Sequence, residues 1–376
     1  MGPIAKCEHF VANSYEDACL IGYNSCDSVH FFIDTYSFSE ERGSMLNTKQ
    51  LKWLSYCSVL VMFLATLGGT VVTKTESGLG CGTDFPLCNG KFVPAHTVAS
   101  MIEYSHRAVS GAAGLLALGT FIVFWKYRRQ RRDLVGYAGL ALIFVMVQAF
   151  MGAMAVINPS SSAVMALHFG FSLIAFASSV MLALGIRQEE RQQAFASAEA
   201  PHPVTRGFRN LTWFATVYTY VVVYIGAYVS HTDSAGGCSG WPLCNGELVP
   251  ELSGGVGIAF FHRVAAALLF IVIAALGHVA FWHHPKNREI RILGLAATIL
   301  IAVQVLTGAA VVFTLNNLEV YLFASLSHML AIAALFGVLC YLSVRAWQLH
   351  RMGKDIRAEE ELALNATVTD SQHKAQ

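Results

Sequence analysis

Charged residues are scarce in this chain of 376 residues. Asp, Glu, Lys and Arg together make up 13% of it, whereas 55% of the residues are hydrophobic, and the mean hydropathy is +0.51. The sequence also lacks the alternating ten-residue pattern of a membrane β-barrel. The formal net charge of +1 says little about partners, and we expect no nucleic acid among them. With a β-barrel excluded, the composition predicts a helical protein that crosses the membrane several times. In lipid, the backbone N–H and C=O groups can form hydrogen bonds only within a helix or a closed barrel.

Apolar runs long enough to cross a bilayer recur along the chain. A helix needs about 20 apolar residues to span a hydrocarbon core of roughly 30 Å. Eight runs meet this length, near residues 51–73, 101–125, 134–156, 163–186, 210–230, 259–282, 292–314 and 320–344. The predicted fold class is therefore all-α, an integral membrane protein with eight transmembrane helices.

Lys and Arg are concentrated in alternate connections between these runs. The segments 126–133, 187–209 and 283–291 and the chain after residue 344 are basic, whereas 75–100 and 231–258 are rich in glycine and hold few cations. Short basic loops stay in the cytoplasm. We therefore expect a multi-pass protein of the cell membrane, with both termini cytoplasmic and two cysteine-containing loops on the outer face.

The polar segment between the fourth and fifth runs contains two prolines and divides the helices into two groups of four. We expect an amino-terminal four-helix bundle over residues 45–190, a cytoplasmic linker at 191–209, a carboxy-terminal four-helix bundle over 210–350 and a cytoplasmic tail at 351–376. Residues 1–44 do not fit this architecture, and they lack the basic start and apolar core of a signal peptide. We interpret them as an atypical amino-terminal extension, with Met45 as the expected start.

The two groups of helices repeat one another in sequence. Matched segments include Thr75-Glu76-Ser77 and Thr232-Asp233-Ser234, Pro86-Leu87-Cys88-Asn89-Gly90 and Pro242-Leu243-Cys244-Asn245-Gly246, His106-Arg107 and His262-Arg263, Gln148 and Gln304, and His168 and His328. Most matched residues lie about 156 to 160 positions apart. The repeat is broken at one place. Glu103 lies three residues before His106, whereas Ala259 lies three residues before His262.

Four of the nine cysteines lie in the two outward loops. Cys81 and Cys88, like Cys238 and Cys244, are placed where disulfides persist, and pairing within each loop is the favoured connectivity. A zinc knuckle is the alternative, although both spacings are wider than zinc sites usually show. An exposed Cys81–Cys88 bond could also be redox-active. Two further cysteines fall within predicted helices and are expected to be buried apolar residues: Cys57 and Cys340.

The four repeated histidines carry the strongest chemical signal. Ionisable residues inside a membrane are costly and mark function by default, although a lone one can serve helix packing. His106, His168, His262 and His328 each lie toward the outer end of their helix. Two facing histidines in one bundle are typical of bis-imidazole ligation of a haem. The histidines near the inner helix ends or in polar segments are mostly expected on solvated surface.

Two other kinds of polar residue accompany these histidines, arginine and glutamine. Arg107 and Arg263 are candidates to bind haem propionates, with contact to lipid headgroups as the alternative. Gln148 and Gln304 lie within helices and are expected to form hydrogen bonds between helices.

The chain resembles the haem A synthase family, specifically its compact bacterial, Bacillus-like type, over residues 45 to 350. The motifs that carry the resemblance are Val71-Val72-Thr73-Lys74-Thr75, Pro86-Leu87-Cys88, Ile102-Glu103-Tyr104-Ser105-His106-Arg107, Ala166-Leu167-His168-Phe169-Gly170 and Gly226-Ala227-Tyr228-Val229. The resemblance implies two pseudo-symmetric four-helix bundles. It also implies oxidation of the C8 methyl group of haem O to a formyl group, which makes haem A for cytochrome oxidase.

Glu103 is where the residues and the resemblance agree. Because Glu103 and His106 share one helix face, the carboxylate would stand beside a haem held by His106, where it could stabilise positive charge or accept a proton. The structural alternative is a partner for Arg107 or a carboxylate near a helix start.

We therefore predict a membrane haem O oxidoreductase. Haem O is expected to bind through His106 and His168, and haem b through His262 and His328. The expected partners are haem O synthase, the cytochrome oxidase assembly pathway, membrane lipid and an electron donor of unknown identity. The main alternative is a non-enzymatic, di-haem b-type electron-transfer cytochrome or haem carrier, which would have no need of a carboxylate in one site alone.

Overall fold

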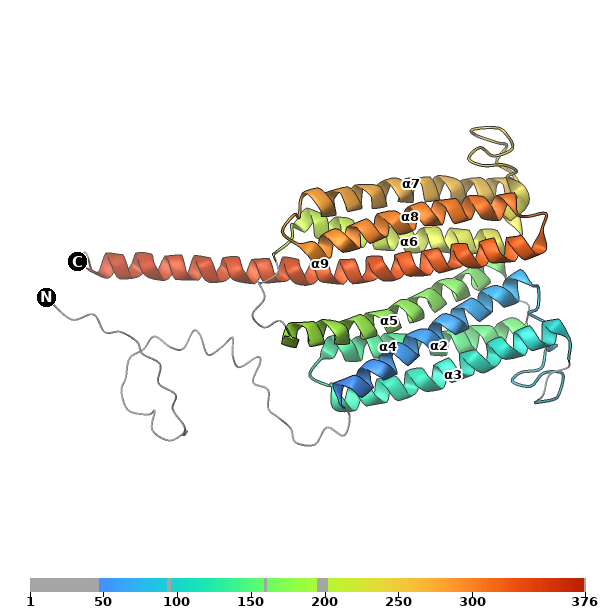
Figure 1. Ribbon diagram of the computed structural model, residues 1–376, viewed down its shortest axis with the longest axis horizontal. Helices are drawn as coiled ribbons and strands as arrows, with labels where there is room; N and C mark the ends of the chain where they lie inside the picture. Colours follow the sequence, from blue (N-terminus) through green and yellow to red (C-terminus); the bar gives the residue numbers. More distant parts are fainter. Residues whose placement is uncertain (1–46, 93–95, 159–160, 195–201, 375–376) are drawn as a thin grey trace. The chain divides into compact units, whose positions relative to one another are not determined.

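Helices make up nearly all of the regular structure (Figure 1). The computed structural model describes residues 47–92, 96–158, 161–194 and 202–374, so the predicted extension at 1–44 lies outside the described residues. The long helices are α2 (Thr48–Lys74), α3 (Val98–Tyr127), α4 (Arg132–Ile157), α5 (Ser162–Ala194), α6 (Arg206–His231), α7 (Gly254–Trp282), α8 (Arg288–Phe313) and α9 (Leu318–Lys374). All eight are long and apolar enough to cross a membrane. The predicted fold class is confirmed.

At several helix starts, which lie close to the predicted positions, a polar side chain caps the helix. At α2, the Asn47 side chain accepts a hydrogen bond from the Lys49 amide at 3.2 Å, and the Asn47 amide donates to Gln50 at 2.9 Å. Such reciprocal caps satisfy amides that have no partner within the helix. Thr97 and Thr205 cap α3 and α6 through their hydroxyl groups.

The last helix continues well past the apolar run that predicts it. The run ends near residue 344, whereas α9 extends to Lys374, through most of the predicted cytoplasmic tail. Ala, Glu, Leu, Lys and Arg are frequent in this part of the chain, and these residues favour helix. Hydropathy detects where a helix leaves the membrane, not where it ends.

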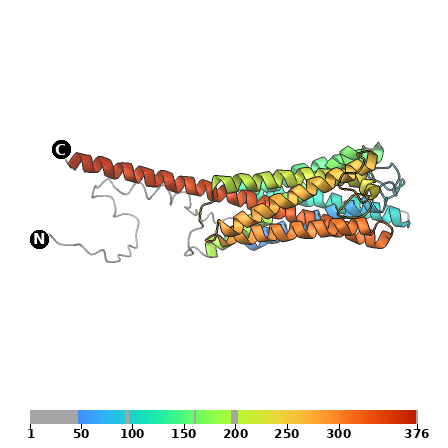
Figure 2. The ribbon, with the colours of Figure 1, turned by 90° about the horizontal axis from the view of Figure 1, so that it is seen from above.

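The helices pack as two sets of four (Figure 1). Helices α2–α5, here the amino-terminal set, contact one another, and helices α6–α9, the carboxy-terminal set, do the same. Helix α5 also contacts α6 and α9, and α2 contacts α9. The view turned by 90° shows the long helices running roughly side by side (Figure 2). This arrangement is consistent with the predicted pair of four-helix bundles.

The two disulfide-containing loops share several matched features, although only the second contains a short 3-10 helix, η2 (Ser234–Gly237), among the described residues. The hydroxyl oxygens of Thr75 and Ser77 lie 2.8 Å apart in the first loop, and those of Thr232 and Ser234 lie 2.8 Å apart in the second. Matched residues also adopt the left-handed backbone region, which few residues other than glycine enter: Glu76 and Asn89 in the first loop, and Asp233 and Asn245 in the second. The sequence repeat is therefore a structural repeat.

Three side chains have surroundings that differ from the expected ones. Cys57 is exposed on the outside of α2 rather than buried, because lipid-facing and buried helix positions are both apolar. His284 and His350 are buried rather than solvated. The ring of His284 lies 4.6 Å from that of Phe208, and His350 Nδ1 lies 3.1 Å from the Val204 carbonyl oxygen. Burial lowers the pKa of His284, and the neighbouring His283 lowers it further.

Candidate functional site

Each disulfide loop closes over the start of a helix that carries one of the repeated histidines. The bonds are Cys81–Cys88 and Cys238–Cys244, so the predicted pairing within each loop is confirmed. Cys81 and Cys88 are 0% and 1% exposed, so the exposure on which a redox-active Cys81–Cys88 bond would depend is not present. The loop folds its cysteines inward against α3, where Cys81 Sγ lies 3.7 Å from the Ser100 carbonyl oxygen.

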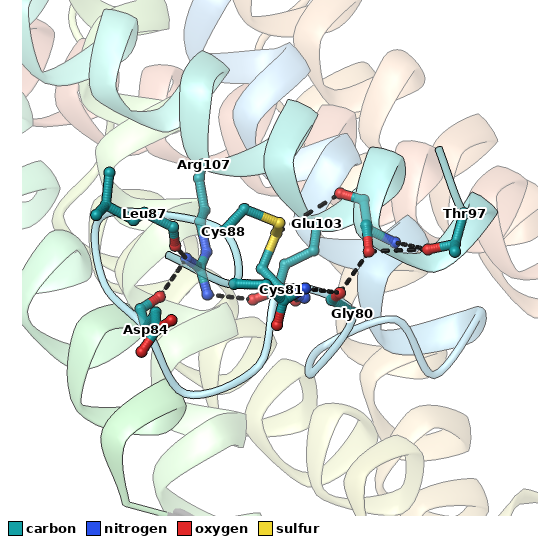
Figure 3. The surroundings of a disulfide bond; sticks show 10 residues. Gly80, Cys81, Asp84, Leu87, Cys88, Thr97, Glu103 and Arg107 are labelled. Atoms are coloured by element: carbon teal, nitrogen blue, oxygen red, sulfur yellow. Dashed lines mark hydrogen bonds and ion pairs between the residues drawn. A yellow bond between two sulfur atoms is a disulfide. The ribbon is translucent and has the colours of Figure 1, made fainter. Parts of the chain in front are cut away.

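Glu103 lies beneath the first loop and is 3% exposed. One carboxylate oxygen accepts a hydrogen bond from the Cys81 amide at 2.8 Å, and the other accepts one from Arg107 Nη2 at 2.5 Å. The Arg107 Nη1 atom donates to the carbonyl oxygens of Asp84 and Leu87, both at 2.7 Å (Figure 3). The carboxylate is therefore held in one orientation by two charge-assisted hydrogen bonds.

The second loop is held without a carboxylate. Arg263 Nη1 donates to the carbonyl oxygens of Gly240 and Leu243, both at 2.9 Å. Its Nη2 atom donates to the carbonyl oxygen of Cys238 at 2.8 Å. Ala259, which is 5% exposed, occupies the place of Glu103. The second loop is thus held by Arg263 and its own disulfide, without a buried carboxylate. The structural alternative for Glu103, a partner for Arg107, is present in the structure. Because the second loop is held without a carboxylate, anchoring a loop does not by itself require one.

Glycines lie against the first histidine of each helix set. A Cβ atom on Gly68 or Gly69 of α2 would stand 3.1 Å or 3.3 Å from the ring of His106, and one on Gly226 of α6 would stand 2.8 Å from Cε1 of His262. Contacts below 3.0 Å essentially never occur for a Cβ atom. These imidazoles therefore fill space that a side chain would otherwise occupy.

The second histidine of each set also lies against a glycine of a neighbouring helix. A Cβ atom on Gly152 of α4 would lie 3.6 Å from Cε1 of His168, and one on Gly308 of α8 would lie 3.0 Å from Cε1 of His328. All four histidines are thus placed alike, each in the groove beside a glycine of a neighbouring helix. We did not predict Gly68, Gly69 or Gly226 as site residues, although Gly69 and Gly226 occur at matched positions of the repeat.

The repeated glutamines form hydrogen bonds between helices, as predicted. Gln148 of α4 donates from Nε2 to the backbone carbonyl oxygen of His168 on α5. Gln304 Nε2 of α8 lies 3.0 Å from His328 Nε2 on α9. Both glutamines therefore tie the helix that carries the second histidine to the preceding helix.

The histidine pairs fit ligation of a haem by two imidazoles. His106 of α3 and His168 of α5 belong to the amino-terminal set, and His262 of α7 and His328 of α9 belong to the carboxy-terminal set. The Nδ1 atoms of His168 and His262 are buried without a hydrogen-bond partner, which is unusual for a buried polar atom. In the described part of the chain, no cluster of three or more His, Cys, Asp or Glu side chains could hold a metal ion. Imidazole nitrogens are common ligands of haem iron, so each pair supplies a donor set that fits a haem.

These features define a polytopic helical membrane protein with two matched histidine pairs. Residues 51–340 match the profile of COX15-CtaA, described as Cytochrome oxidase assembly protein. The chain belongs to this family, and the predicted resemblance is confirmed.

Curated relatives agree with the family match. A protein named Heme A synthase from Symbiobacterium thermophilum is 40% identical over 294 residues, which cover 78% of this chain and 94% of the relative. Proteins of the same name from Bacillus licheniformis and Geobacillus kaustophilus are 41% and 38% identical. The first alignment covers 78% of this chain and 95% of that relative, and the second covers 81% and 93%.

Proposed function

We propose that this chain is a membrane oxidoreductase that oxidises the C8 methyl group of haem O to the formyl group of haem A. The family match and the names of the relatives support this activity. The observation that carries it is Glu103, a buried carboxylate in only one of two otherwise matched sites. The relatives are named as synthases, which lends no support to the alternative of an electron-transfer cytochrome or haem carrier.

The amino-terminal set binds the substrate in this proposal. His106 and His168 hold haem O, and Glu103 lies three residues from His106, on the same face of α3. As the methyl carbon is oxidised, the carboxylate stabilises developing positive charge or accepts a proton. The hydrogen bonds from Arg107 and the Cys81 amide hold the carboxylate in place for this role.

The carboxy-terminal set holds a resident haem b through His262 and His328. The haem would supply one-electron chemistry when bound, and the imidazoles of His262 and His328 would hold it. Each arginine beside the first histidine also stands near a haem edge in this proposal. The Nε atom of Arg107 is buried without a partner, so it is a donor available to a propionate.

The orientation in the membrane follows from the distribution of cations. The basic connections and both termini lie in the cytoplasm, and the two disulfide loops lie on the outer face. Haem O synthase supplies the substrate, and the product enters cytochrome oxidase assembly. In terms of domains, residues 45–190 form the catalytic bundle and residues 210–350 the cofactor bundle.

The activity is tested by producing the chain in cells that make haem O but lack haem A. Haems extracted from the membranes are separated by chromatography. We expect haem A to appear only in cells that contain the chain, and the purified protein to carry haem b as well. A protein that binds haem yet yields no haem A, although haem O is present, would be a carrier or a cytochrome.

The glycine beside His262 offers a test of the haem b site. In Gly226→Ala, the new Cβ atom would lie 2.8 Å from the imidazole, so the ring must move. Overpacking of this kind costs about 1–3 kcal/mol, and we expect haem b retention to weaken roughly tenfold or more. The absorbance of the low-spin haem per milligram of protein measures this.

The matched control for this variant is Gly207→Ala on the same helix. Gly207 is exposed, and a Cβ atom there would meet nothing within 4 Å. We expect this variant to keep its full haem content. Equal haem content in the two variants would mean that His262 is not an axial ligand in the geometry proposed.

A further inference from the structure

His328 has hydrogen-bond partners on the neighbouring helix α8 at both of its ring nitrogens, whereas the Nδ1 partner of His106 is Ser110 of its own helix, at 3.5 Å. Gln304 Nε2 lies 3.0 Å from His328 Nε2, and Thr307 Oγ1 lies 3.1 Å from His328 Nδ1. The Nδ1 atoms of His168 and His262, by contrast, are buried without a partner.

The partners of His328 determine which nitrogen carries the proton. An amide nitrogen can only donate a hydrogen bond, so Nε2 of His328 accepts from Gln304, and the proton of the neutral imidazole lies on Nδ1. The Thr307 hydroxyl donates to the carbonyl oxygen of Val303 at 2.9 Å or of Gln304 at 3.1 Å. It therefore keeps a lone pair to accept the Nδ1–H group. In this tautomer, the lone pair of Nε2 would bind iron in place of the hydrogen bond from Gln304, whereas the Nδ1–H bond to Thr307 can remain.

The repeat provides a natural comparison. Gln148 aligns with Gln304, but Met151 stands where Thr307 does, and a thioether is only a weak acceptor. The Gln148 side chain donates to the backbone of His168 instead of its ring. The amino-terminal set thus has a glutamine at the matched position without the hydroxyl that would orient the ring of its second histidine.

We propose that Thr307 is the positioning residue of the carboxy-terminal haem site, because it fixes the tautomer and the rotation of His328. The inference rests on the proposed function in one respect, the placement of haem b on His262 and His328. A ligand histidine whose other nitrogen is bonded binds metal more firmly and in one orientation. The hydrogen bond from His328 to Thr307 therefore suits a cofactor that stays bound. His168 has no such hydroxyl partner, which suits a substrate that must bind and leave.

The test measures haem loss from the purified full-length protein to an excess of apomyoglobin, followed in the Soret band. Thr307→Val keeps the shape of the side chain and removes the acceptor. We expect haem b to leave about 10- to 100-fold faster and the low-spin spectrum to broaden or shift. Thr307→Ser keeps the hydroxyl and should restore slow release. If the Thr307→Val protein does not accumulate, Thr307→Ala also removes the hydroxyl acceptor and takes its place.

The matched control is Thr219→Val in the same helix set. Thr219 is fully buried, and its hydroxyl donates to the Ala215 carbonyl oxygen of its own helix at 2.7 Å. We expect parental haem release from it. Release as slow from Thr307→Val as from the parent, or release from Thr307→Ser as fast as from Thr307→Val, would overturn the role of Thr307.

His328→Ala separates this inference from the proposed function. If His328→Ala loses haem b while Thr307→Val releases it at the parental rate, the haem site stands and the role of Thr307 is wrong. If His328→Ala keeps a full bis-histidine spectrum, the placement of haem b itself is wrong, and Thr307 has no ligand to position.

Discussion

Glu103→Gln is expected to stop haem A formation while haem binding survives. The substitution removes the negative charge but leaves the four histidines untouched, so the chain should still bind haem O and haem b. Loss of a charge or a base at a reacting centre typically lowers rates by two or more orders of magnitude. We expect haem A to fall at least about 100-fold. Haem O should accumulate, or the alcohol that forms when the methyl group is oxidised only part of the way to the formyl group. Chromatography of extracted haems measures all three.

The structure also defines what this variant does to the loop. Both carboxylate oxygens of Glu103 accept hydrogen bonds, one from the Cys81 amide and one from Arg107, whereas the oxygen of a glutamine occupies only one of these positions. Thiol labelling therefore accompanies the haem analysis, to establish that the Cys81–Cys88 bond still forms. A loss of haem binding together with loss of the disulfide would indicate a structural role for Glu103.

Glu289→Gln is the matched control for the same change of charge. Glu289 near the start of α8 accepts hydrogen bonds from Arg345 and Tyr341 at 2.8 Å, so it is also an ion-paired carboxylate, but it lies at the opposite end of the helices from the disulfide loops. We expect this variant to make haem A normally. Haem A at the parental level in Glu103→Gln would show that the Glu103 charge is not needed for the oxidation and that its role is structural.

Substitution of His262 or His328 by alanine should remove the low-spin b-type spectrum of the purified protein. An iron that loses one of two axial imidazoles cannot remain in the bis-histidine state. The corresponding variants in the amino-terminal set, His106→Ala and His168→Ala, should chiefly lose bound haem O or its product and keep haem b. Optical and electron paramagnetic resonance spectra distinguish the two outcomes.

His278→Ala is the control for these variants. His278 lies on α7, like His262, but its ring faces Trp282 and His283 near the other end of the helix, with centroids 6.4 Å from each. Its substitution should leave both haems in place. An intact bis-histidine spectrum in His262→Ala would show that the carboxy-terminal pair does not hold haem b.

The membrane fold and the candidate site were predictable from the sequence because both depend on spacing along the chain. Eight apolar runs of bilayer length define the helices, since a lipid-facing backbone has no partner outside its own helix. The repeat brings out four matched histidines and the lone Glu103 without any knowledge of contacts. Disulfide pairing within each loop was also predictable, because the two cysteines of each loop are close in sequence.

The environment of each side chain was decided only by the tertiary structure. Apolar patterning does not distinguish lipid from protein interior, so Cys57 was expected inside and lies outside. The burial of Cys81 depends on how its loop folds onto α3, and the contact of Gly226 with His262 depends on the approach of two helices. Thr307 has no distinguishing feature in the sequence beyond its mismatch with Met151. Hydrogen bonds and close contacts join residues far apart in the chain, so only the packing of the helices reveals them.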